Sequence, residues 1–220
     1  MDNWIFKYHE AIQKKEVIVG VWVRLCFEIL TTGLLNGEWE FNEKKANKAI
    51  KFIENFCHHS EGRSDLLHLE LWQKAIVSAI FGIMDKTTGY RQFREVFIIV
   101  ARKNGKTLFA AAIAAYMTYV DGEYGAKVYF LAPKLDQADL VYDAFYQIVQ
   151  ADDELDSITK KRRSDIYIKE FNTSVKKIAF NSKKSDGFNP QMVVNDEMEA
   201  WQGDQGLKQY EVCLLYTSDA

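Results

Sequence analysis

The sequence predicts an α/β fold: a mainly parallel sheet flanked by helices, with a helical extension before it. Two short apolar runs, residues 96–100 and 127–131, are each followed by a long helical stretch, beginning near Lys106 and Leu135. Parallel strands need a crossover connection, which helices commonly supply. The third observation is helical periodicity throughout residues 1–62.

Within the extension, Ala46, Ala49, Ile50 and Ile53 recur at intervals of three and four residues, and Asn42 stands where an N-cap is expected. A second amphipathic stripe over residues 72–83 predicts a helix that leads into the main domain.

Beyond the two strand-helix units, residues 165–169 and 175–180 alternate in hydropathy around a polar Asn172-Thr173-Ser174 turn, which predicts a hairpin. Residues 191–195 predict a last strand, and it ends in two acids. These elements give an expected division into a helical extension (1–62), a core domain (63–212) and a tail (213–220).

The composition excludes several classes of protein. With 48% hydrophobic residues and a net charge of -3, the chain is neither disordered nor a general DNA coat, so any nucleic-acid contact must be local. Three widely spaced cysteines (Cys26, Cys57, Cys213) predict reduced thiols. No apolar stretch approaches the ~20 residues of a membrane span. With no export leader evident, we expect a cytoplasmic protein without membrane contact.

The strongest motif is the loop of residues 101–107, between an apolar run and an alanine-rich helix. A helix N-terminus offers unpaired amides to an anion, Lys106 adds a charge, and the Thr107 hydroxyl suits magnesium. Gly105 fits the turn, but Val100 stands where G-x-x-x-x-G-K-[ST] has its first glycine. The alternative is a basic turn that caps a buried helix.

A pair of carboxylates follows the last predicted strand. ATP hydrolysis needs one acid for the magnesium ion and another to orient and deprotonate the attacking water. We assign Asp196 to the metal and Glu197 to the water, and the alternative is a solvated loop. Because parallel strands converge at their carboxyl ends, Lys106 should face these acids.

Other candidates have weaker support. Trp72 and Gln73 offer a ring and an amide for adenine, although Trp72 suits a core equally well. Arg102, Lys103 and Asn104 complete the phosphate loop, and the two cations there are suited to charge on the transferred phosphoryl group or are simply solvated. The basic run 160–163 follows several acids and predicts a solvated surface. The string Cys57-His58-His59 lacks a second ligand pair at zinc spacing, so it predicts a helix end.

These pieces, in this order, resemble the large terminase subunits of tailed double-stranded DNA phages and prophages. The resemblance runs from Tyr8 to about Tyr210. A phosphate loop without its first glycine is itself typical of that family, whereas Asn195 departs from the apolar residue usual before the acid pair. The segments that carry the resemblance are residues 15–24, 39–41, 71–73, 101–107, 130–133, 136–138, 185–190, 195–197 and 199–201.

The resemblance implies a P-loop NTPase fold of the RecA-like, additional-strand type that uses ATP and Mg²⁺. It implies that Arg102 senses or stabilises the γ-phosphate. It also implies a motor that drives double-stranded viral DNA into the procapsid from the host bacterial cytoplasm. Full-length family members are expected to form a homo-oligomeric ring on the portal protein, fed by the terminase small subunit, and to carry a C-terminal nuclease that this chain lacks.

Residues 213–220 resemble one reading frame of a sequencing-library adapter, so we expect a non-native tail without specific contacts. Two rival interpretations remain open at this point. One is another P-loop nucleic-acid motor of the helicase type, and the other is an inactive fragment that binds nucleotide without hydrolysing it.

Overall fold

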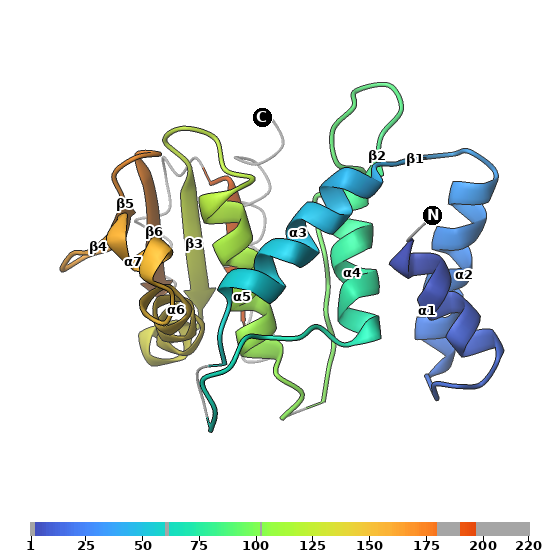
Figure 1. Cartoon of the computed structure of the whole chain (residues 1–220), viewed down its shortest axis with the longest axis horizontal. Coiled ribbons are helices and arrows are strands. Elements are labelled where there is room, and N and C mark those ends of the chain that lie inside the picture. The colour runs from blue at the N-terminus through green and yellow to red at the C-terminus, as the bar shows by residue number, and fades with distance from the viewer. Residues whose placement is uncertain (1–2, 60–61, 102, 180–189, 197–220) are drawn as a thin grey trace. The chain divides into compact units, whose positions relative to one another are not determined.

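The computed structural model describes residues 3–59, 62–101, 103–179 and 190–196. The chain divides into two compact units (Figure 1): residues 1–55 with 67–100, called here the helical unit, and residues 56–66 with 101–220, called the sheet unit. The family segments at 185–190 and 199–201 and the tail at 213–220 lie outside the described residues. Among the residues described, no helix combines the length and apolarity that crossing a membrane requires.

The helical unit packs the apolar stripes of three helices together. Ile5, Tyr8 and Ile12 of α1 lie in one buried cluster with Phe27 and Leu30 of α2 and with two alanines of α4. Helices are therefore present where residues 1–62 predicted them, whereas the expected domain division at residue 62 stays a prediction. Its elements in chain order are α1 (Trp4–Gln13), α2 (Val21–Leu35), β1 (Glu40–Phe41), α3 (Glu43–Phe56), α4 (Leu71–Gly82) and β2 (Ile83–Met84).

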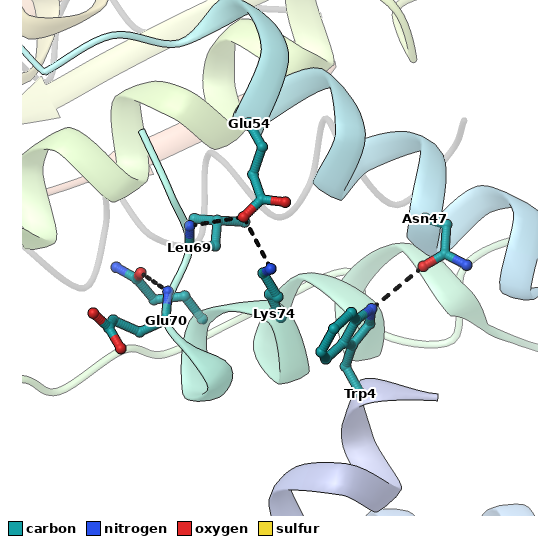
Figure 2. Close-up of polar contacts among 7 residues, drawn as sticks. Trp4, Asn47, Glu54, Leu69, Glu70 and Lys74 are labelled. Atoms are coloured by element: carbon teal, nitrogen blue, oxygen red, sulfur yellow. Dashed lines mark hydrogen bonds and ion pairs between the residues drawn. The ribbon is translucent and has the colours of Figure 1, made fainter. Parts of the chain in front are cut away.

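Polar contacts hold α3 against α1 and α4 (Figure 2). The Trp4 indole donates a hydrogen bond to Asn47 Oδ1 at 3.4 Å, and the Glu54 carboxylate binds both Lys74 Nζ at 2.9 Å and the Leu69 amide at 3.0 Å. The predicted N-cap is also confirmed, because Asn42 Oδ1 accepts from the Lys45 amide at 3.0 Å. One face of α3 is thus committed to the unit, and the opposite face is left to solvent.

The prediction of a strand at residues 96–100 is wrong. The structure gives this segment no helix or strand, and Phe97 and Ile99 are 65% and 99% exposed. An apolar run supplies the composition of a buried strand, but a strand also requires a neighbouring backbone to complete its hydrogen-bond ladder. Residues 96–100 are therefore apolar without being paired to another strand among the described residues.

The sheet unit contains a five-stranded sheet in the order β4-β5-β6-β3-β7. Strand β3 pairs in parallel with β6 and β7, and β4, β5 and β6 pair antiparallel. The α/β class and the parallel centre are confirmed. The elements are α5 (Lys106–Tyr119), β3 (Lys127–Ala132), α6 (Leu135–Gln150), α7 (Asp153–Ser157), β4 (Thr159–Lys161), β5 (Ile166–Ile168), β6 (Thr173–Ala179) and β7 (Met192–Asn195).

The predicted hairpin is the β5–β6 pair, in which Ile168 lies opposite Thr173. Asn172 in its turn has φ of 52°. Asparagine tolerates this left-handed conformation better than most residues, which explains why the reversal can be so short.

Aromatic rings and alanines fill the core of the sheet unit. Phe145 of α6 is 0% exposed, and its ring centroid lies 5.9 Å from that of Phe130 on β3 and 6.4 Å from that of Tyr119 on α5. Four alanines of α5 are fully buried, which lets α5 approach α6 closely. They are Ala111, Ala112, Ala114 and Ala115.

The basic run 160–163 is exposed, as expected, and begins within β4. Lys161 Nζ lies 4.0 Å from the centre of the Tyr146 ring, and the Arg162 guanidinium lies 3.5 Å from that of Tyr167. Two of its cations therefore rest on tyrosine rings of the same unit, a cation–π arrangement that favours their present positions.

Candidate functional site

The loop before α5 is a sharp reversal. Lys103 and Gly105 both have positive φ, 66° and 69°, and the Asn104 side-chain amide donates to the Ala101 carbonyl at 3.1 Å. Alternation of left- and right-handed residues turns successive backbone N–H groups toward one concave side, an arrangement that binds anions. For Lys103 this conformation costs on the order of 1 kcal/mol or more, because only glycine adopts it freely.

Helix α5 begins directly after this loop, with Gly105 as its N-cap and Lys106 and Thr107 in its first turn. Among the described residues no side chain caps this end, and no acidic residue stands in the first turn. A Cβ placed on Gly105 would meet nothing within 4 Å. The first-turn N–H groups and the positive end of the helix dipole therefore have no side-chain cap in the described part of the chain, and such a helix start suits an anionic group.

A substitution at Gly105 separates backbone strain from steric clash. Because space around the residue is open but φ is 69°, Gly105→Ala should destabilise the loop by about 1–2 kcal/mol through strain alone. Gly105→Asn should retain most of the stability, because asparagine tolerates the left-handed region. Binding of a fluorescent ATP analogue to the two variants measures the difference. Equal binding by both variants and the parent would show that this backbone geometry is unimportant.

Asp196 is held at the carboxyl end of β7. Its backbone N–H donates to the Leu131 carbonyl at 3.1 Å, which extends the parallel β3–β7 ladder by one bond. Its side chain is only 16% exposed. The preceding Asn195 has a buried Oδ1 with no hydrogen-bond partner in the described part of the chain. Because consecutive side chains along a strand project to opposite faces, the Asn195 and Asp196 side chains leave this strand end on different sides.

The structure brings the predicted cation and the first predicted acid together. Lys106 Nζ lies 3.3 Å from Asp196 Oδ1, with the two side chains 42% and 16% exposed. This contact joins the first turn of α5 to the end of β7, segments about 90 residues apart in the chain. The expected opposition of Lys106 and Asp196 is therefore present, whereas their chemical roles stay predictions.

The other predicted residues are placed differently. Thr107 lies in the first turn of α5, partly buried. Arg102 and Glu197 lie outside the described residues, so the structure gives no position for the predicted phosphoryl-charge residue or the predicted water-orienting acid.

Trp72 and Gln73 begin α4 in the helical unit. The Gln73 side-chain carbonyl accepts from the Glu70 amide at 2.8 Å and forms a capping box, and Trp72 packs against the unit's apolar cluster. These contacts give both residues a structural role in starting and packing α4. An adenine contact from either one stays a prediction.

The Cys57-His58-His59 string follows the end of α3. Burial, reinforced by the charge of Asp152, raises the pKa of the Cys57 thiol to about 12, so this thiol stays protonated at neutral pH. His58 Nδ1 lies 2.9 Å from the Ser64 carbonyl, and His59 Nε2 lies 2.6 Å from the Arg63 guanidinium. Within the described ranges, no group of three His, Cys, Asp or Glu residues is arranged to hold a metal ion.

Sequence reasoning missed the Leu131 carbonyl, which ties Asp196 to β3. No side-chain pattern signals such a contact, because the backbone oxygen of any residue at that register would make it. The sequence shows that Asn195 is a polar residue at the end of an apolar strand, but it does not show that the side-chain oxygen is buried.

The donor set fits a magnesium–nucleotide complex. An ammonium group and helix amides without a side-chain cap among the described residues suit phosphate oxygens, and the carboxylate of Asp196 and the hydroxyl of Thr107 are oxygen ligands of the kind that Mg²⁺ prefers. The residues present therefore fit this group.

Comparison with known proteins found one matching family and similar solved structures. The family model described as terminase large subunit, ATPase domain, matches residues 71–216. The crystal structure of the HK97 bacteriophage large terminase is similar with a TM-score of 0.64 and 23% identity, over 76% of this chain and 35% of that one. An ATPase-domain mutant of the Thermus phage P74-26 large terminase gives a TM-score of 0.43 and 18% identity, over 53% of each chain. No curated protein matches.

Proposed function

Because the chain belongs to the family of terminase large-subunit ATPase domains, we propose that it binds ATP with Mg²⁺ and hydrolyses the γ-phosphoryl bond. The observation that carries this proposal is the 3.3 Å approach of Lys106 Nζ to Asp196 Oδ1 beside the uncapped start of α5. The chain spans 35% of the length of the HK97 large terminase. The activity of the whole protein is therefore part of the proposal.

In this proposal, Lys106, the amides around Gly105 and the side chains of Arg102, Lys103 and Asn104 bind the phosphates. Thr107 and Asp196 would hold the magnesium ion, which neutralises charge on the phosphate oxygens. Glu197 would accept a proton from the attacking water as the bond between the γ-phosphorus and the ADP oxygen breaks. Arg102 would stabilise the charge that develops on the transferred group. The adenine ring would lie against Trp72, with Gln73 beside it.

For the whole protein, we propose that hydrolysis drives double-stranded DNA into a viral procapsid. The protein would act as a homo-oligomeric ring on the portal protein, supplied with DNA by the terminase small subunit, in the cytoplasm of the host bacterium. Support for this role comes from family membership and from the fold, and it implies DNA contacts beyond the nucleotide site.

The deciding experiment separates nucleotide binding from hydrolysis. Glu197→Gln keeps the size of the side chain but removes the base, so it should leave Mg–ATP binding within about twofold and reduce phosphate release by about 10²- to 10⁴-fold. Glu170→Gln, at an exposed turn residue, serves as the matched control and should hydrolyse ATP like the parent. The ATPase rates of both variants are best compared in the whole protein, with DNA present.

Two results would count against the proposal. Parental turnover in Glu197→Gln would remove that residue from the chemistry. ATP binding without hydrolysis by the gene-length parent, under all DNA conditions, would show a nucleotide-binding module rather than a motor.

A further inference from the structure

The solvent face of α3 is made of lysines. Its buried face carries Ala46, Ala49, Ile50, Phe52 and Ile53. On the other side, all of the lysines of the helix are exposed: Lys44, Lys45, Lys48 and Lys51. Because 3.6 residues make one turn, these four side chains project from neighbouring positions over about 10 Å of helix. They are called here the lysine face.

Among the described residues, none of these four ammonium groups forms an ion pair with a carboxylate. Lys14, Lys74, Lys106 and Lys177 each lie within 4 Å of a carboxylate, whereas no residue of the lysine face forms such an ion pair in the described ranges. The acid nearest the end of α3, Glu54, is already bound to Lys74 at 2.9 Å (Figure 2). The lysine face thus keeps its positive charge for an external anion.

The same side chains line a hollow in the helical unit. Its volume is about 1020 Å³, and its charged lining consists of the lysine face together with Glu40 and Glu43. The lining therefore carries a net charge of about +2 at neutral pH, because lysine is protonated and glutamate ionised there. In a chain of net charge -3, this local excess is the kind of patch that a polyanion requires.

We propose that the lysine face binds the phosphate backbone of double-stranded DNA. This inference rests on the proposed function, in which the whole protein acts on duplex DNA. Lysines are flexible point charges that contact phosphates without reading bases, and the lysine face offers no arginine for bidentate contact with guanine. Binding would therefore be independent of sequence, as a protein that moves along DNA requires.

The other basic segment fits DNA less well. Lys161 and Arg162 rest on the rings of Tyr146 and Tyr167. The acids of α7 and its cap, among them Asp153, Glu154 and Asp156, stand immediately before this run. With the N-cap Asp152 there are four such acids, which balance the four cations of the run, whereas the lining at the lysine face keeps a net charge of about +2. The run 160–163 is therefore a matched control, with four cations at a different place on the chain.

The test measures the affinity of the full chain for a labelled DNA duplex of about 30 base pairs, roughly three helical turns. Fluorescence anisotropy is recorded between about 50 and 200 mM salt. Three variants are compared: K44Q/K45Q/K48Q/K51Q, the charge-preserving K44R/K45R/K48R/K51R, and K160Q/K161Q/R162Q/R163Q.

If four phosphate contacts are lost, the slope of log K against log salt should fall by about 3 to 4 in the first variant. Its affinity should fall at least about tenfold at the lower salt concentration. The arginine variant and the 160–163 variant should bind within about threefold of the parent, on the scale of a rim-charge change. Parental binding by the first variant overturns the proposal. An equal loss in both glutamine variants also overturns it, since a general change in net charge would then suffice.

Two further measurements keep this result separate from folding and from the proposed ATPase. Glutamine is a good helix former, so the far-ultraviolet circular dichroism and thermal midpoint of the first variant should match those of the parent. Its Mg–ATP affinity should also be unchanged. If the chain does not bind ATP but its DNA binding depends on the lysine face, only the proposed function is contradicted. If the chain binds ATP but its DNA affinity does not change when the lysine face is substituted, only this inference is contradicted.

Discussion

Lys106→Ala is expected to reduce Mg–ATP hydrolysis by at least about 10²- to 10³-fold, the effect of removing one preorganised donor from a developing charge. In the proposed site, the Lys106 ammonium supplies the point charge beside the phosphates. Alanine also leaves Asp196, only 16% exposed, without its cationic neighbour. Phosphate release by the gene-length protein measures the effect.

Lys14→Ala provides the control for this experiment. Lys14 is also in an ion pair, 2.6 Å from Glu10, and its side chain is 58% exposed against 42% for Lys106. Because an exposed pair contributes little to stability, Lys14→Ala should retain parental turnover. Parental turnover in Lys106→Ala as well would remove the basis of the proposed chemistry.

Phe145→Ala is expected to give the largest loss of stability in the sheet unit, about 3–5 kcal/mol. The ring is 0% exposed and is packed between Phe130 and Tyr119, so its removal leaves a cavity that α5, α6 and β3 cannot all close. Hydrogen exchange of amides in β3 and α6 reports on this unit specifically.

Tyr124→Ala is the matched truncation of an aromatic residue at the surface, since Tyr124 is 79% exposed. It should change the exchange free energies by no more than about 0.5 kcal/mol. Equal protection in the Phe145→Ala and Tyr124→Ala variants would show that the cluster around Phe145 is not central to the unit's stability.

Much of this fold was predictable because its signals are local. Helices α5 and α6 each come after a short apolar run and were predicted from their helical sequence pattern. Asn42 is a preferred N-cap residue, and Asn172 tolerates the left-handed conformation that its turn requires. Strand β4, with only three mainly polar residues, and the five-residue α7 were missed because such short elements have too little periodicity to detect. The prediction of a strand at residues 96–100 was wrong for a different reason. Their composition is typical of a strand, but they pair with no neighbouring strand among the described residues.

In the candidate site, topology explains only half of the meeting of Lys106 and Asp196. Asp196 follows the parallel strand β7, as predicted, but Lys106 follows residues 96–100, which form no strand. The position of Gly105 in the left-handed region was consistent with its residue type. The use of Gln73 in a capping box was not foreseen, since Glu70 occupies the N-cap where Ser or Thr is the usual signal.

Helix α5 connects two distant parts of the sheet unit. It starts at Lys106 and ends about 20 Å away at Tyr119, whose hydroxyl lies 2.6 Å from Thr159 Oγ1 on β4. Alanine has no rotamers through which a displacement of the helix can be absorbed, and close-packed interiors transmit strain. The buried alanines in the middle of α5 therefore make the helix rigid. A small axial shift of its first turn is expected to move Tyr119 as well and so to change the contact of its hydroxyl with Thr159 on β4.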